Sequence, residues 1–410
     1  MSSEVKIKID GLLVGMYVSK IDRSWMDVPI SLEGMVISNN DDIDLIRKHC
    51  EYVYVDTNKG RSPSPMYWVI DENETNNQNE TIDLGKNEFS VLRKETYPVS
   101  SSLSNELTVA KDLYRSMQNQ INSALKSLQF QDKVDIDTVH DVAVSAVDSV
   151  IRHPDALRLV LELKESNKSS YNRALGTSIW CAQIGRSLGF EKYQIEELTM
   201  GGLLLDVGKT KIPATIINKS SPLTPKEIEM FRAHVDQSVS LLIKSKDIPH
   251  NVMRMVATHH ERYDGSGYPM GLKDADMPVY GKIAALADSF DAMTHYRSYT
   301  KGSHSPHQAI SDIYQLRGKF YNPDLVDIFI HTIGVYPAGS IVELNTGEVA
   351  VVFSVNSKKK LKPVVMVVTD KNKEAIEATH PIDLSAKEDY YIIRGLSNGE
   401  YNIELDVIEI

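Results

Sequence analysis

The sequence predicts a mainly α-helical protein, with an all-helical core between a small α/β domain at the N-terminus and a β-rich domain at the C-terminus. Apolar residues recur every three or four positions over much of 103–333, which is the spacing of one helix face. Short alternating or apolar runs bounded by turn residues occur before residue 60 and after Pro337, as expected of strands. At roughly 100–200 residues per domain, 410 residues suffice for about two to four domains.

The N-terminal 60 residues predict the small α/β domain. Val5–Ile9 alternates like a strand, Asp41–His49 has the composition of a short helix capped by Asn40 or Asp41, and Tyr52–Val55 forms a second strand. Residues 61–102 then turn polar and contain an Asn/Glu-rich tract, which predicts a linker.

Residues 103–153 predict a helical connector, because the apolar residues between Leu103 and Leu128 and those in Val139–Ile151 keep helical spacing. These helices either pack into the bundle or serve as signalling helices of a homodimer. A helical domain over 154–336 begins with Ala156–Leu163.

The β-rich C-terminal domain is predicted over 337–410. Its four expected strands are Ser340–Leu344, Val349–Val355, Pro363–Thr369 and Tyr390–Ile393.

Composition excludes several functional classes. The net charge of −11 counts against binding a nucleic-acid polymer, which requires a basic surface. The N-terminus lacks the apolar stretch of a secretory signal, and no apolar run approaches the ~18 residues that would span a membrane. Cys50 and Cys181 lack paired spacing, which fits core positions in a reducing compartment. We therefore expect a cytoplasmic protein.

Residues 234–288 carry the strongest chemical pattern. His259 and His260 are adjacent, and neighbours in mid-helix do not share a face, so the pair is expected to end a helix and lead into the Gly-rich loop that follows. An isolated His pair is more often structural than metal-binding. Asp206, His234 and Asp288 lie in separate helical segments, and the whole set resembles the ligands of metal-dependent hydrolases.

From about Pro154 to Val326 the chain resembles the HD-GYP family of cyclic-dinucleotide phosphodiesterases, because His259–Pro269 matches the family's HHExxDGxGYP signature in full. The segments Gly208–Pro213, Leu223–Glu227 and Ala287–Tyr299 also match, and residues 1–60 resemble a small domain that often precedes HD-GYP modules in bacteria. The resemblance implies an all-helical catalytic core, a centre of two or three metals, often iron or manganese, and hydrolysis of cyclic di-GMP or a related dinucleotide.

Two histidines that the family uses as metal ligands are absent. The family's HD dipeptide falls on Leu205-Asp206, and its first ligand histidine falls on Arg173. Ser169 also lacks the carboxylate that binds a third metal in some members.

The resemblance implies that one metal position retains only Asp206 and Asp288. The other position keeps its full ligand set, which is Asp206, His234, His259 and His260. We expect one divalent metal, iron or manganese, and no complete second site. Because Arg only donates hydrogen bonds, Arg173 is expected to pair with Asp206, Asp288 or both in place of the first metal.

Other family positions are kept. The resemblance gives Lys209 a catalytic and phosphate-binding role beside Asp206, and it gives Tyr268, Arg297 and Lys301 ligand-binding roles. It also implies that signalling proteins dock on the Gly265–Pro269 loop. Separately, Thr224–Glu227 forms a capping box that is expected to open the helix of His234.

Three functions follow. The missing histidines favour a cyclic di-GMP signalling protein that binds the dinucleotide or docks a partner with little hydrolysis. The alternative is an active metal-dependent phosphodiesterase that yields linear dinucleotide or GMP. A mononucleotide hydrolase of the wider HD superfamily is disfavoured by the intact loop.

Overall fold

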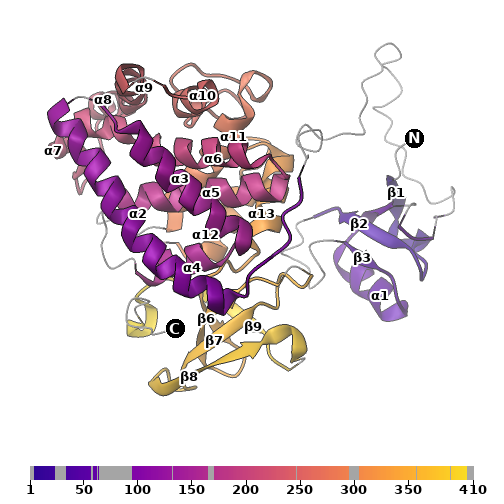
Figure 1. The fold of residues 1–410 in the computed structure, drawn as a ribbon. Coiled ribbons are helices and arrows are strands. Elements are labelled where there is room, and N and C mark those ends of the chain that lie inside the picture. The colour runs from indigo at the N-terminus through magenta and orange to yellow at the C-terminus, as the bar shows by residue number, and fades with distance from the viewer. Residues whose placement is uncertain are drawn as a thin grey trace, which may run out of the picture. The chain divides into compact units, whose positions relative to one another are not determined.

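The computed structural model describes residues 4–23, 34–56, 59–61, 63, 95–131, 133–164, 170–245, 247–294, 304–356, 358–387 and 389–403. Residues 1–91 with 357–360 form one compact unit, and residues 92–356 with 361–410 form the other. The structure confirms the mainly α fold class (Figure 1). Within the described ranges, no helix is both long enough and apolar enough to span a membrane.

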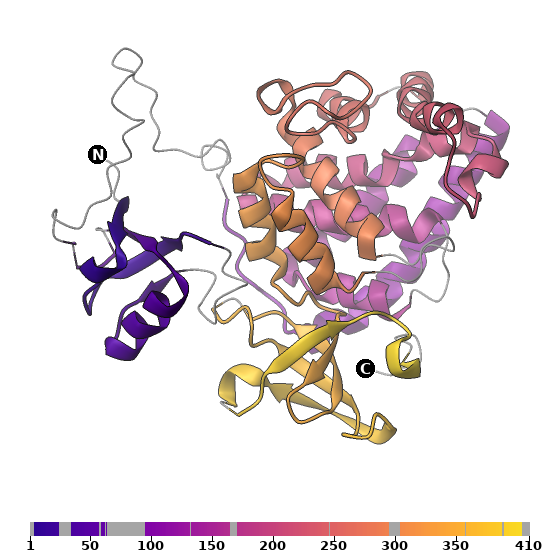
Figure 2. The ribbon, with the colours of Figure 1, turned by 180° about the vertical axis from the view of Figure 1, so that it is seen from behind.

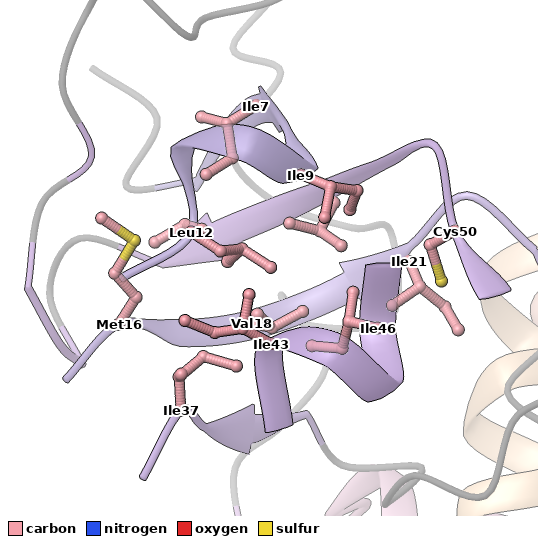
Figure 3. Close-up of a cluster of buried hydrophobic side chains, with 12 residues drawn as sticks. Ile7, Ile9, Leu12, Met16, Val18, Ile21, Ile37, Ile43, Ile46 and Cys50 are labelled. Atoms are coloured by element: carbon pink, nitrogen blue, oxygen red, sulfur yellow. The ribbon is translucent and has the colours of Figure 1, made fainter. Parts of the chain in front are cut away.

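The first unit contains an antiparallel sheet with the strand order β1-β4-β2-β3. Its elements are β1 (Glu4–Lys8), β2 (Tyr17–Ile21), β3 (Met35–Val36), α1 (Asn40–His49) and β4 (Tyr52–Asp56). Ile43 and Ile46 of α1 point into a buried cluster with apolar side chains of the strands (Figure 3). The predicted N-cap of α1, Asn40 or Asp41, was wrong, because Asn39 caps the helix and forms a capping box with Asp42.

The second unit begins with a bundle of helices, seen from the opposite side in Figure 2. The helices are α2 (Leu103–Gln131), α3 (Ile136–Arg152), α4 (Ala156–Leu163), α5 (Ser170–Leu188), α6 (Lys192–Leu204), α7 (Ala214–Ile217), α8 (Pro225–Arg232), α9 (His234–Ser245), α10 (His250–Thr258), α11 (Val279–Thr294), α12 (Pro306–Gln315) and α13 (Pro323–Ile333).

Local sequence explains where these helices start and how they pack. The side chain of Asp135 caps α3 by accepting the backbone N–H of Thr138, and the apolar stripe of α3 is buried. Trp180 of α5 contacts Phe290 of α11 and Phe329 of α13 edge-on, with ring centroids 5.1 and 6.3 Å away. The centre of the core therefore ties α5 to α11, and both helices supply side chains to the site.

One local prediction about the helices was wrong. The capping box of Thr224 and Glu227 opens α8, whereas the helix of His234 is the separate α9. Ala233 is a turn residue between the two helices.

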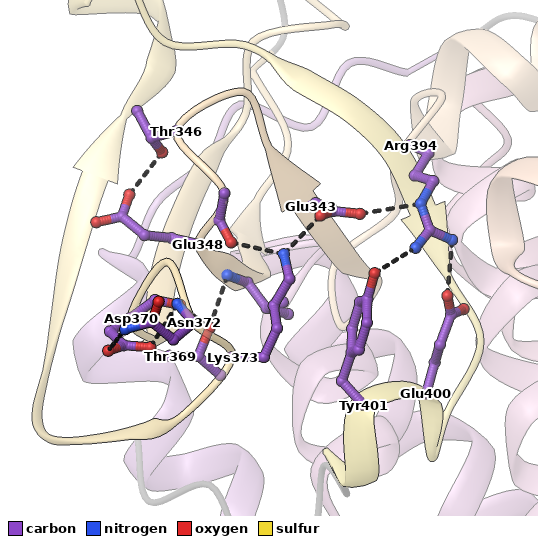
Figure 4. A network of polar contacts seen from close by, with 12 residues as sticks. Glu343, Thr346, Glu348, Thr369, Asp370, Asn372, Lys373, Arg394, Glu400 and Tyr401 are labelled. Carbon is purple, nitrogen blue, oxygen red and sulfur yellow. Dashed lines mark hydrogen bonds and ion pairs between the residues drawn. The ribbon is translucent and has the colours of Figure 1, made fainter.

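The C-terminal part is an antiparallel sheet with the order β8-β7-β6-β5-β9. Its strands are β5 (Ile341–Leu344), β6 (Val349–Ser354), β7 (Val364–Thr369), β8 (Ala375–Asp383) and β9 (Ile392–Leu396). The fourth predicted strand was placed too early, since β9 begins at Ile392. Glu343 of β5 accepts hydrogen bonds from Arg394 of β9 (2.9 Å) and from Lys373 in the turn between β7 and β8 (2.5 Å). These bonds link β5 to β9 and to that turn (Figure 4).

The C-terminal sheet is attached to α4. The backbone N–H of Val355 donates to Asp155 Oδ2 at 3.0 Å, just before α4 begins. Gly339 lies directly on Glu162, where an added Cβ would come within 2.5 Å of Cγ. The domain boundaries at 60, 102, 153 and 336 stay predictions.

Candidate metal centre

Asp206 is positioned by the turn that follows α6 and packs against α9. It precedes the 3-10 turn η6 (Val207–Lys211), and Gly208 in that turn packs so closely on α9 that an added Cβ would lie 2.1 Å from the carbonyl oxygen of His234. Ser238 Oγ donates to the carbonyl of Leu205 at 2.9 Å and accepts the N–H of Gly208 at 2.8 Å. These contacts hold Asp206 beside the first turn of α9.

His234 and His259 are buried and held in one orientation. The Nδ1 atoms lie 2.7 Å from the carbonyl oxygens of Phe231 and Val256, respectively. A carbonyl only accepts, so each Nδ1 carries the hydrogen and each Nε2 presents a lone pair to Asp206. Burial lowers the pKa of His234 to about 4 and also lowers the pKa of His259, so both rings are neutral at neutral pH.

The structure brings Asp206, His234, His259 and His260 together, with one ligand atom of each within 4.8 Å of the others. His260 Nε2 lies 3.1 Å from His234 Nε2, and His234 Nε2 lies 3.4 Å from Asp206 Oδ1. Among the described residues, Asp206 Oδ1 and His259 Nε2 are buried and form no hydrogen bond. Such converging lone pairs on neutral imidazoles and a carboxylate fit a divalent transition-metal ion.

Arg173 and Asp288 form an ion pair beside this cluster. Arg173 on α5 donates from Nη2 to Asp288 Oδ1 on α11 at 2.6 Å, and the two side chains are 25% and 7% exposed. Burial raises the pKa of the Asp288 carboxyl, but Arg173 together with smaller contributions from Lys209 and His259 outweighs burial, so this pKa lies below its usual value. Of the partners expected for Arg173, the structure gives a hydrogen bond to Asp288.

Asp206 has a cationic partner of its own. Lys209 Nζ lies 2.5 Å from Asp206 Oδ2. Burial lowers the pKa of Lys209, although the charge of Asp206 opposes this shift. The side chain of Leu205, the position at which the resemblance implies a histidine, is 2% exposed and offers no ligand atom. Arg297, Lys301 and Ser169 lie outside the residues that the structure describes.

Sequence reasoning missed a second layer of charge behind Arg173. Asp291 is fully buried one turn after Asp288, and one of its oxygens lies 3.9 Å from Arg173 Nε. Its other oxygen lies 3.9 Å from Nη1 of Arg158, a buried residue of α4 that also pairs with Glu162. The three-residue spacing of the two aspartates on one helix was the available signal.

Glu261 also received no role from the sequence, although it lies inside the signature. It is fully buried, and its carboxylate oxygens accept the N–H groups of Met270 (2.7 Å) and Leu272 (2.9 Å). These bonds close the 261–272 loop, whose Tyr268 stacks on His260 with ring centroids 4.7 Å apart and planes at 27°. Glu261 therefore holds the loop against the metal-ligand cluster.

Changing Glu261 to glutamine is expected to destabilise the protein by about 1–2 kcal/mol, because an amide offers only one oxygen for the two buried N–H groups. Thermal unfolding of the purified variant measures this effect, with Glu229→Gln on the exposed face of α8 as the control. A Glu261→Gln protein as stable as the control would contradict the structural role.

Three family models match the chain. Residues 156–325 match the model described as "HD domain", residues 4–139 match "Domain of unknown function (DUF3391)", and residues 341–404 match "KOW domain associated with HD domain". The second match extends across the predicted boundaries at 60 and 102.

Curated relatives extend along most of the chain. "Cyclic di-GMP phosphodiesterase PA4108" of Pseudomonas aeruginosa is 26% identical over 373 residues, which are 88% of this chain and 84% of the relative. "Cyclic di-GMP phosphodiesterase" of Thermotoga maritima is 29% identical over 280 residues, which are 66% of this chain and 72% of the relative. A solved structure, "Bd1817, a HDG"Y"P protein from Bdellovibrio bacteriovorus", is 15% identical with a TM-score of 0.46, and the match covers 80% of this chain and 98% of that one.

Proposed function

Because the chain belongs to the HD-GYP family, we propose that it is a cyclic di-GMP signalling protein that binds the dinucleotide, holds one metal ion and hydrolyses little of its ligand. The observation that carries this proposal is the ion pair between Arg173 and Asp288. It stands where the family resemblance calls for a metal with a histidine ligand. A guanidinium supplies positive charge there but cannot activate water as a metal does.

Asp206, His234, His259 and His260 would hold the proposed ion, which we expect to be iron or manganese. When bound, a divalent ion at this position polarises a phosphoryl oxygen as a Lewis acid. A second ion would have only the carboxylates of Asp206 and Asp288, because Leu205 is an alkyl side chain and Arg173 carries a positive charge. The structural partners of the histidines, the carbonyls of Phe231 and Val256, keep both rings aligned without the ion.

The ligand-binding residues of the proposal lie around this cluster. Lys209 brings a cation to its edge, and the stacked pair of Tyr268 and His260 offers an aromatic surface. Arg232 extends the surface, with its guanidinium 4.7 Å from the centre of the Tyr268 ring. Arg297 and Lys301 stay proposed contacts to the ligand.

Partner binding is a further part of the proposal. The Gly265–Pro269 loop is proposed to dock signalling proteins, and Met270 beside it is 57% exposed. A homodimer through the long helices of the connector is proposed as the assembly.

An active phosphodiesterase is the second candidate. It is favoured by the complete group of four ligands and by Lys209, which lies beside Asp206. It requires catalysis with one metal ion or with a rearranged pair of ions. The two candidates agree on the ligand and differ in turnover.

The test of the proposed function combines metal analysis, ligand binding and turnover on the purified full chain. We expect at most one tightly bound metal per chain, saturable binding of cyclic di-GMP, and turnover below the ~1 per second of ordinary enzymes. Elemental analysis, equilibrium dialysis and chromatography of the products measure these quantities. Two stoichiometric metals, or turnover at ~1 per second or above, would support the phosphodiesterase instead.

A further inference from the structure

We propose that Arg173 and Lys209 directly bind the phosphodiester groups of the cyclic dinucleotide, so that the chain keeps measurable affinity for its ligand when no metal is bound. This inference rests on the proposed function and assigns the charges that recognise the ligand. It gives Arg173 a binding role in addition to its ion pair.

Each of the two cations pairs with an acidic residue at the edge of the cluster. Lys209 contacts Asp206 at 2.5 Å, and Arg173 contacts Asp288 at 2.6 Å. They are near enough to each other that the charge of Arg173 helps burial to lower the pKa of Lys209. A cyclic dinucleotide has two phosphodiester groups, and we assign these two cations to them.

Both cations are also accessible from outside. The side chains of Arg173 and Lys209 are 25% and 21% exposed, whereas those of His234 and His259 are fully buried. Arg158, the other arginine near Asp291, is 2% exposed, which suits a structural charge. Exposure thus separates the two arginines into one that a ligand can reach and one that it cannot.

Each cation keeps donors for a ligand. The guanidinium has five N–H donors and the ammonium has three. Arg173 forms its hydrogen bond to Asp288 through Nη2 alone, whereas its Nε is buried 3.9 Å from Asp291, so the donors left for a ligand are those at the end of the guanidinium. A guanidinium fork suits the two free oxygens of a phosphodiester.

The charges at the edge of the cluster also suit an anionic ligand. Lys209 and Arg173 offset their contact partners Asp206 and Asp288, so a divalent ion in the four-residue cluster would add positive charge next to a ligand that carries two negative charges. Removal of the ion weakens this match, but the donors on Lys209 and Arg173 remain. We therefore expect a reduced affinity after chelation, with binding still present.

The experiment measures cyclic di-GMP binding by calorimetry on the full chain, first reconstituted with manganese and then treated with a chelator. The main variant combines Arg173→Gln with Asp288→Asn, which removes the cation together with the carboxylate that it hydrogen-bonds, while Arg158 still lies beside Asp291. We expect this variant to bind about 10–100-fold more weakly than the wild type in chelator. Lys209→Gln is the second variant and is expected to show the same direction.

The matched control is Arg152→Gln with Glu106→Gln, which removes an Arg–carboxylate pair of α3 and α2, helices that supply no site residue. Its affinity should equal that of the wild type. A wild type that binds with manganese but not in chelator would overturn this inference alone, as would unchanged affinity in both site variants. A wild type that binds under neither condition would overturn the proposed function as well.

Discussion

Replacing Arg173 by alanine is expected to lower the free energy of unfolding by about 3 kcal/mol, the lower end of the range for breaking a buried ion pair. The variant leaves Asp288 without its cation, and Asp288 is only 7% exposed. Asp291, which is fully buried, loses a positive charge 3.9 Å away. Because Arg173 is one-quarter exposed, water replaces part of what the guanidinium supplied.

Chemical denaturation of wild type and variant measures this change. Adding Asp288→Asn to the Arg173→Ala protein should recover a large part of the lost stability, because the unpaired charge is then gone. Arg173→Lys is the conservative control and should lose less. A loss below about 1 kcal/mol, the scale of an exposed ion pair, would mean that the pair with Asp288 does not stabilise the fold.

The helical spacing of apolar residues was sufficient to predict much of the helical core. The prediction of Ala156–Leu163 agrees at both ends with α4, because an apolar run there follows Pro154 and Asp155 and ends where the chain becomes polar. Strand β8 was not predicted, since it is mostly exposed and therefore shows no clear alternation of apolar residues, and it contains Pro381. An edge strand of this kind is defined by its hydrogen bonds to β7, which sequence patterns do not report.

The same limit applies to the site. Arg173 could be proposed from its register on a helix, because the family resemblance fixes that register. Ser238 and Glu261 could not be given roles, since their contacts join segments that are distant in the chain or buried backbone groups of a loop. Asp291 and Arg158 belong to the same class, because their charges meet only after α4, α5 and α11 pack together.

Restoring both histidines, with Arg173→His and Leu205→His in one chain, is expected to raise the metal content from one toward two ions and to increase cyclic di-GMP hydrolysis by about 100-fold. Residues that bind a metal directly should matter at least as much as the groups that hydrogen-bond to those ligands, whose changes alter affinity or activity ~10–100-fold. The double variant removes the cation that repels a second ion. It also adds imidazoles next to the carboxylates of Asp206 and Asp288, which already lie at this position.

Each single variant is a control: Leu205→His alone keeps the guanidinium of Arg173, and Arg173→His alone lacks the histidine beside Asp206. Elemental analysis and product chromatography under manganese or iron measure the outcome. A stable double variant that still holds one ion and hydrolyses no faster than the wild type would show that Arg173 and Leu205 are not what limits the second metal site.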